Sequence, residues 1–80
     1  MLLGKVVGNV TATRKQAALA GHKFLVIQAE GYPAGQMLVA VDLMGAGVDE
    51  RVIVATGRAA RIAMGKDDMP VDAAVVGIVD

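Results

Sequence analysis

The segment "LMGAGVDE" (residues 43–50) has the arrangement of residues that most resembles a site of chemistry. A glycine-rich turn after a strand can hold phosphate with its backbone N–H groups. The dinucleotide-binding pattern would require a third glycine where Glu50 stands, followed by a helix, but a strand-like run follows here. We therefore interpret the segment as a tight turn in which glycine supplies a positive φ. The turn residues are Gly45, Ala46, Gly47 and Asp49.

The titratable side chains offer little for catalysis or for metal binding. His22 is the single histidine and the chain has no cysteine, so the usual nitrogen and sulfur ligands of a metal site are scarce. Asp67 and Asp68 are adjacent in a polar segment that is typical of a solvated loop. Asp42 and Asp72 stand at the ends of strand-like runs and are expected to cap turns or to pair with arginines. We expect no enzymatic activity, no cofactor and no metal.

The elements that carry these residues are short strands separated by turns. Residues 14–21 read as a loop or a single helical turn, 29–35 as a turn, and 57–65 as one to two turns of helix. The chain is an all-β protein on this reading, a small five-stranded OB-like β-barrel with one short helix between strands 4 and 5. It forms a single domain over residues 1–80. The predicted strands are 2–13, 23–28, 36–44, 51–56 and 71–79.

The first predicted strand has a regular alternation. Every second position from residue 2 to residue 12 is apolar or glycine, which places these residues on one face. They are Leu2, Gly4, Val6, Gly8, Val10 and Ala12. Glycines at this spacing permit the sharp coiling that a strand needs to wrap a small barrel. We therefore expect both glycines on the same face of this strand.

The other predicted strands are apolar on both faces, which bears on assembly. Hydrophobic residues make up 55% of the chain, and no long helix is predicted that could cover a second face. Exposed apolar surface on this scale is rare in monomers, so we expect a homo-oligomer with an apolar interface. The alternative is that several apolar runs are shorter than they seem and the monomer suffices.

Charge and composition argue against other partners. The net charge is zero and aromatic residues are only 2% of the chain, which disfavours a nucleic-acid groove. No apolar run approaches membrane-spanning length, and the N-terminus lacks the pattern of a signal peptide, so we expect a cytosolic protein without membrane contact. An OB-like module that binds nucleic acid or peptide remains the alternative function.

Three blocks of sequence resemble one family over nearly the whole chain. They are "LGKVVGNVTATRK" (3–15), "LVAVDLMGAGVDERVIVATGRAAR" (38–61) and "PVDAAVVGIVD" (70–80). They are similar, in the same order, to the bacterial microcompartment vertex proteins of the EutN/CcmL family. The chain departs from the family pattern at Asp49, where glycine is common, and at Arg58-Ala59, where the family has a pair of serines.

The resemblance implies a structural function. Members of this family form homopentamers that close the fivefold vertices of a polyhedral protein shell in the bacterial cytoplasm. Hexameric or pseudohexameric facet shell proteins are their partners. The family motif also suggests a segment at the subunit interface or near the central pore. Its residues are Gly57, Arg58, Ala59, Ala60 and Arg61.

Overall fold

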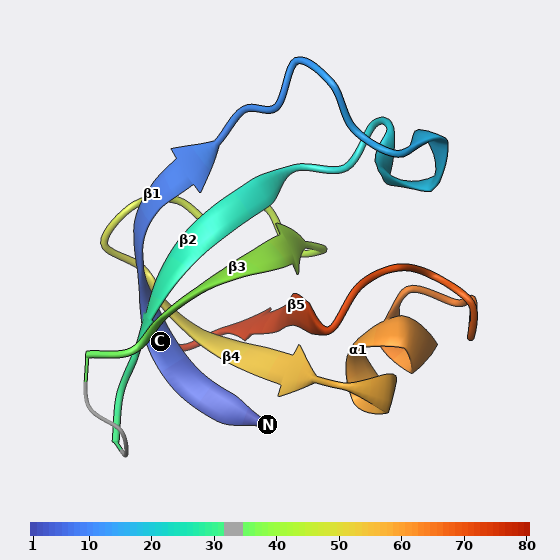
Figure 1. The fold of residues 1–80 in the computed structure, drawn as a ribbon. Helices are drawn as coiled ribbons and strands as arrows, with labels where there is room; N and C mark the ends of the chain where they lie inside the picture. Colours follow the sequence, from blue (N-terminus) through green and yellow to red (C-terminus); the bar gives the residue numbers. More distant parts are fainter. Residues whose placement is uncertain (32–34) are drawn as a thin grey trace.

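The computed structural model describes residues 1–31 and 35–80, so residues 32–34 of the turn predicted at 29–35 lie outside the described part. It confirms a five-stranded closed barrel with one short helix between strands 4 and 5 (Figure 1). A single turn of 3-10 helix, η1, lies within the segment predicted as a loop or helical turn. The elements are β1 (Leu2–Val10), η1 (Ala17–Leu19), β2 (Phe24–Ala29), β3 (Met37–Asp42), β4 (Arg51–Thr56), α1 (Arg58–Ala63) and β5 (Ala73–Ile78).

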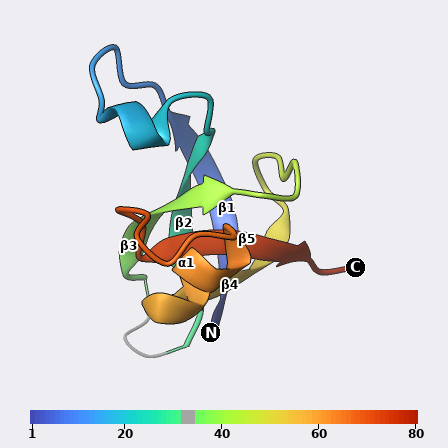
Figure 2. The ribbon, with the colours of Figure 1, turned by 90° about the vertical axis from the view of Figure 1, so that its right-hand side faces the viewer.

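The barrel closes in the strand order β1-β2-β3-β5-β4. Neighbouring strands are antiparallel except for β3 and β5, which are parallel. The β3–β5 pairing is also the shortest, with Val41 opposite Ala74 and Asp42 opposite Val75. The helix α1 lies against β4 and β5, as Figure 2 shows. The barrel wall is therefore weakest between β3 and β5.

Two apolar clusters stabilise the fold, one inside the barrel and one outside it. Full burial of each such aliphatic side chain is worth about 1.5–3 kcal/mol, so the inner cluster is the main source of stability. The largest fully buried side chains are Val6, Leu25, Ile27, Val52, Val54 and Val75. The outer cluster fills the space beneath α1 and the segment that follows it. Its buried members are Val41, Ala55, Ala60, Met69, Val71 and Ala74.

The structure corrects the expectation for the first strand. β1 ends at Val10 rather than at residue 13, and its register with β2 shifts between Val6 and Gly8. Because one extra residue at such a bulge exchanges the faces of all later side chains, Gly8 no longer shares the face of Gly4. Gly8 pairs with Val26, and it is the two neighbours of Val26 on β2, Leu25 and Ile27, that point into the core. Gly8 therefore lies on the outer face. The sequence alternation continues through the bulge, but the structural alternation does not.

Gly4 is required by close packing, whereas Gly8 is not. A Cβ at Gly4 would overlap Ile27 Cγ2 and come within 3.0 Å of the backbone oxygen of Gln28. A Cβ at Gly8 would meet no atom within 4 Å. β1 can therefore approach β2 at this point only if residue 4 has no side chain.

We predict that Gly4→Ala lowers the free energy of unfolding by about 1–3 kcal/mol, because the methyl group overpacks the barrel interior. Gly8→Ala is the matched control and leaves stability equal or slightly higher, since glycine inside a strand is itself unfavourable. Denaturant unfolding at one fixed protein concentration measures both. Equal stability of the two variants would contradict the packing assigned to Gly4.

Candidate functional site

In the turn between β3 and β4, backbone N–H groups donate hydrogen bonds to nearby carboxylates of the same chain. Asp42 Oδ1 accepts hydrogen bonds from the backbone N–H groups of Met44 and Gly45, both at 3.0 Å. Glu50 Oε1 accepts one from the Gly47 N–H at 2.7 Å. The backbone amides that would hold a phosphate thus already donate to acidic side chains of the same chain. The negative charge of these side chains would also repel an anion. The segment connects β3 to β4, and Asp42 caps its start through these two hydrogen bonds.

The backbone conformation of the turn is carried by two residues. Gly45 has φ 78°, as expected for glycine, and Asp49 has φ 76°. Asp49 is the single non-glycine residue with positive φ in the described ranges 1–31 and 35–80. Gly47 does not share this conformation, and Ala46 packs into the inner core. Asp49, where the family that the sequence resembles commonly has glycine, is therefore a left-handed position in the structure.

The remaining candidate residues for chemistry stay apart. His22 is half-buried and lines a hollow of about 220 Å³ beside Lys15 and Lys23. Asp67 forms an exposed ion pair with Arg58, whose Nε lies 3.5 Å away. Within the described residues, no three histidine, cysteine or acidic side chains come together as a metal site would require. Among the same residues, no helix is both long and apolar enough to cross a membrane.

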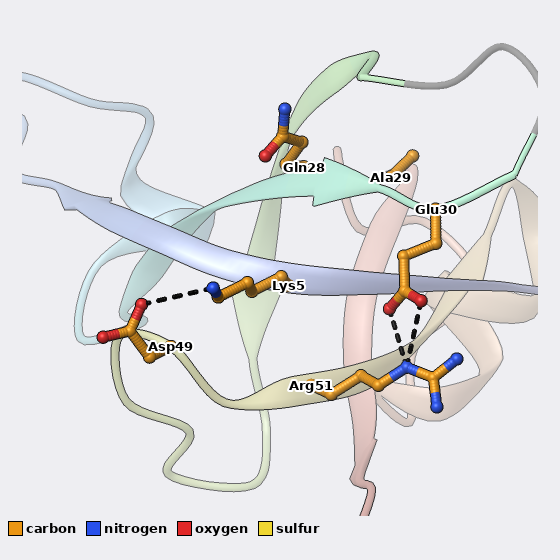
Figure 3. Close-up of a pocket in the computed structure, with 6 residues that line it drawn as sticks. All are labelled: Lys5, Gln28, Ala29, Glu30, Asp49 and Arg51. Carbon is orange, nitrogen blue, oxygen red and sulfur yellow. Dashed lines mark hydrogen bonds and ion pairs between the residues drawn. The ribbon is translucent and has the colours of Figure 1, made fainter.

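A surface hollow of about 450 Å³ lies over β1, and four of its six lining residues are charged (Figure 3). Lys5 and Arg51 are direct cross-strand neighbours, an arrangement that repels. Each has an acidic partner that offsets this repulsion. Lys5 Nζ lies 3.6 Å from Asp49, and Arg51 Nε donates to both oxygens of Glu30 at 3.0 and 2.7 Å.

The Arg51–Glu30 pair crosses the outside of β1, because Glu30 follows β2 and Arg51 begins β4. The hydrogen bond from Arg51 holds the pKa of Glu30 below its ordinary value, and the same bond raises the pKa of Arg51. Both side chains are substantially exposed, so water screens the attraction. The hollow thus contains matched pairs of charges that join β1, β2 and β4, rather than a reactive group. Sequence reasoning did not identify these pairs, because they depend on strand register.

The segment 57–61 divides between the core and the surface. Gly57 is the N-cap residue of α1 with φ 59°, and its N–H donates to the Asp72 carbonyl at 2.8 Å. Ala60 is fully buried in its own subunit, and Arg61 is half-buried with a long hydrogen bond to the Val71 carbonyl. Gly57, Arg58 and Ala59 are exposed, so these three members of the segment are available to a neighbour.

Apolar side chains remain exposed on the outside of the barrel. This agrees with the expectation that one chain cannot cover both faces of its strands. The helix α1 covers part of the outer face of β4 and β5, but no comparable element covers β2 or the start of β3 in the described structure. The large exposed apolar residues are Met1, Leu3, Val7, Val10, Met37, Val39, Met44, Val48, Ile62 and Ile78.

We predict that Asp49→Val lowers the free energy of unfolding by about 1–2 kcal/mol, because a β-branched residue is strained at positive φ. Asp49→Asn is the control, since asparagine tolerates this conformation while its side chain carries no charge. Its stability should stay within about 0.5 kcal/mol of the parent, as exposed ion pairs contribute little. Denaturant unfolding measures the free energy of unfolding of both variants. An equal loss in both would mean that the lost charge, rather than backbone strain, destabilises the protein.

The comparisons with known proteins cover the whole chain. The model of the family described as "Ethanolamine utilisation protein EutN/carboxysome" matches residues 1–80. The bacterial microcompartment shell vertex protein GrpN of Rhodospirillum rubrum is 49% identical over 83 residues, which span 100% of this chain and 93% of GrpN. The carboxysome shell vertex protein CcmL of Synechocystis sp. is 47% identical over 83 residues, with 100% of this chain and 83% of CcmL covered.

Solved structures agree with this relationship. An ethanolamine utilization protein EutN superposes with a TM-score of 0.92 at 37% identity, over 100% of this chain and 86% of that one. The GrpN pentameric microcompartment shell protein from Rhodospirillum rubrum superposes with a TM-score of 0.87 at 44% identity, over 100% and 94%. Sequence, fold and full-length coverage lead to one conclusion: the chain belongs to the EutN/CcmL family.

Proposed function

We propose that this chain is a structural protein that forms a homopentamer and caps the fivefold vertices of a bacterial microcompartment shell in the cytoplasm. The observation that carries the proposal is that relatives named as shell vertex proteins match this chain from end to end. Two of the solved neighbours are described as pentameric shell proteins. Those names describe a structural role rather than a catalytic one.

The physical properties of the barrel support self-association. A closed ring needs the same pair of unlike surfaces on every subunit, each fitting the next. The exposed apolar side chains on the barrel wall supply the kind of surface that permanent interfaces bury. The uncovered apolar wall supports a ring, and the number five comes from the relatives.

We assign the segment 57–61 to the subunit contact or to the rim of the central opening. Two of its exposed members, Arg58 and Ala59, replace the pair of serines that the family motif contains. Arg58 is paired with Asp67, so its positive charge is partly balanced within the subunit. A ring of such pairs would give the rim less positive charge than the arginines alone.

The partners that we propose are further copies of this chain and the hexameric or pseudohexameric proteins of the shell facets. Nucleic acid and membrane are left out of the proposal. The zero net charge and the scarcity of aromatic residues give neither the cationic groove nor the stacking surface that oligonucleotide binding uses. Nothing in the structure favours the OB-like binding module over the shell protein.

We predict that native mass spectrometry of the purified chain gives one main species at five times the subunit mass of 8.2 kDa. The species should persist at low ionic strength and at high ionic strength, because an apolar interface is not screened by salt. A chain that remains a monomer or dimer at micromolar concentration would contradict the proposed vertex function.

A further inference from the structure

The barrel wall has an open edge along the first half of β3. Hydrogen bonds from Ala29 N–H to the Gln36 carbonyl and from Asp42 N–H to the Lys23 carbonyl show that the even-numbered residues bond to β2. Because hydrogen-bonding direction alternates along a strand, the backbone groups of Met37 and Val39 point the other way, toward β5. The β3–β5 pairing begins only at Val41. Among the residues that the structure describes, Met37 and Val39 therefore have no partner strand on this side, and we call this edge the β3 seam.

Hollows lie on both sides of this seam. The outer one has a volume of about 160 Å³ and the inner one about 290 Å³, and both are bordered by Asp72 and Ala73. Val39 and Val41 face the outer hollow, whereas Leu38 faces the inner one, as expected from the alternation of a strand. The other residues lining the outer hollow are Leu19, Phe24, Pro70 and Val71. The other residues lining the inner hollow are Leu2, Gln36, Thr56 and Gly57.

β3 itself carries neither charge nor proline along the seam, while Pro70 and Asp72 border it from the segment before β5. Natural edge strands carry charges, proline or a bulge that prevent another chain from pairing with them. Residues 37–41 read "MLVAV", with no charge and no proline. Met37 is 56% exposed and Val39 is 51% exposed, so the same strand also presents apolar side chains to its surroundings. Such an edge invites association unless a partner covers it.

We propose that the β3 seam is the surface on which a neighbouring copy of this chain docks. This inference rests on the proposed ring and deepens it by naming one of the two unlike surfaces. The occupant is a second copy because relatives of this chain are pentamers, so that each subunit must seat a neighbour. Gly57 borders the inner hollow, which makes the seam continuous with the segment 57–61. Asp72 is the one charged residue bordering either hollow, so docking there buries mainly apolar surface.

The test compares two substitutions with the same chemistry at similarly exposed valines. Val39→Asp places a carboxylate in the seam, where docking would strip it of water without a partner. Val48→Asp places the same group on the β3–β4 turn, outside the seam, and Val48 is 53% exposed. Native mass spectrometry of the full chain, with circular dichroism as the check of folding, gives the oligomeric state of each variant beside the parent.

We expect the parent and Val48→Asp to remain rings, and Val39→Asp to shift to the monomer mass of 8.2 kDa at the same protein concentration. A Val39→Asp ring as stable as the parent ring would overturn the seam while leaving the vertex function intact. Equal dissociation of both variants would also overturn it. A parent that forms no ring would refute the proposed function itself.

Amide hydrogen exchange keeps the inference testable if Val39→Asp fails to fold. In the parent ring, the amides of Met37 and Val39 should exchange slowly, because the neighbour excludes water from an edge that is open in the single subunit. Exchange of these two amides as fast as in the exposed residues of the 66–68 loop would overturn the proposal. Slow exchange would support it.

Discussion

The rest of the structure depends on one imbalance: the barrel wall is apolar on both sides, but the chain covers only part of its outside. The inner face is filled by aliphatic side chains. The outer face is covered at one end by α1 and the segment after it, which bury Val41, Ala55 and Ala74. The outer wall elsewhere keeps large apolar side chains exposed. A domain of this size has little stability to spare, so the uncovered wall favours association with other copies.

The charged residues described above stabilise turns and strand pairs of the barrel. Asp42 and Glu50 satisfy the amides of the β3–β4 turn, while Glu30 and Asp49 offset the repulsion between Lys5 and Arg51. These groups are thereby committed to holding strands and turns in register. A protein whose role is to maintain a precise shape in a shell has use for such contacts, and little use for an activated nucleophile or base.

Much of the fold could be predicted from the sequence, since short apolar runs separated by glycine-rich turns define the five strands and the helix bracketed by glycines. The face on which Gly8 lies could not be predicted, because the sequence alternates regularly through the bulge at Val7. The strain at Asp49 was signalled only by the family's glycine at that position. The ion pair between Glu30 and Arg51 and the open β3 seam depend on which strands become neighbours, and local pattern does not contain that information.

Closure of shell vertices by this chain is tested most directly by electron microscopy. The shells are assembled from the facet proteins that we propose as its partners, with and without this chain. We expect closed polyhedral shells with fivefold density at the vertices when the chain is present, and open vertices or sheets and tubes when it is omitted. Closed shells of the same form in both preparations, with no density for the chain at the vertices, would contradict it.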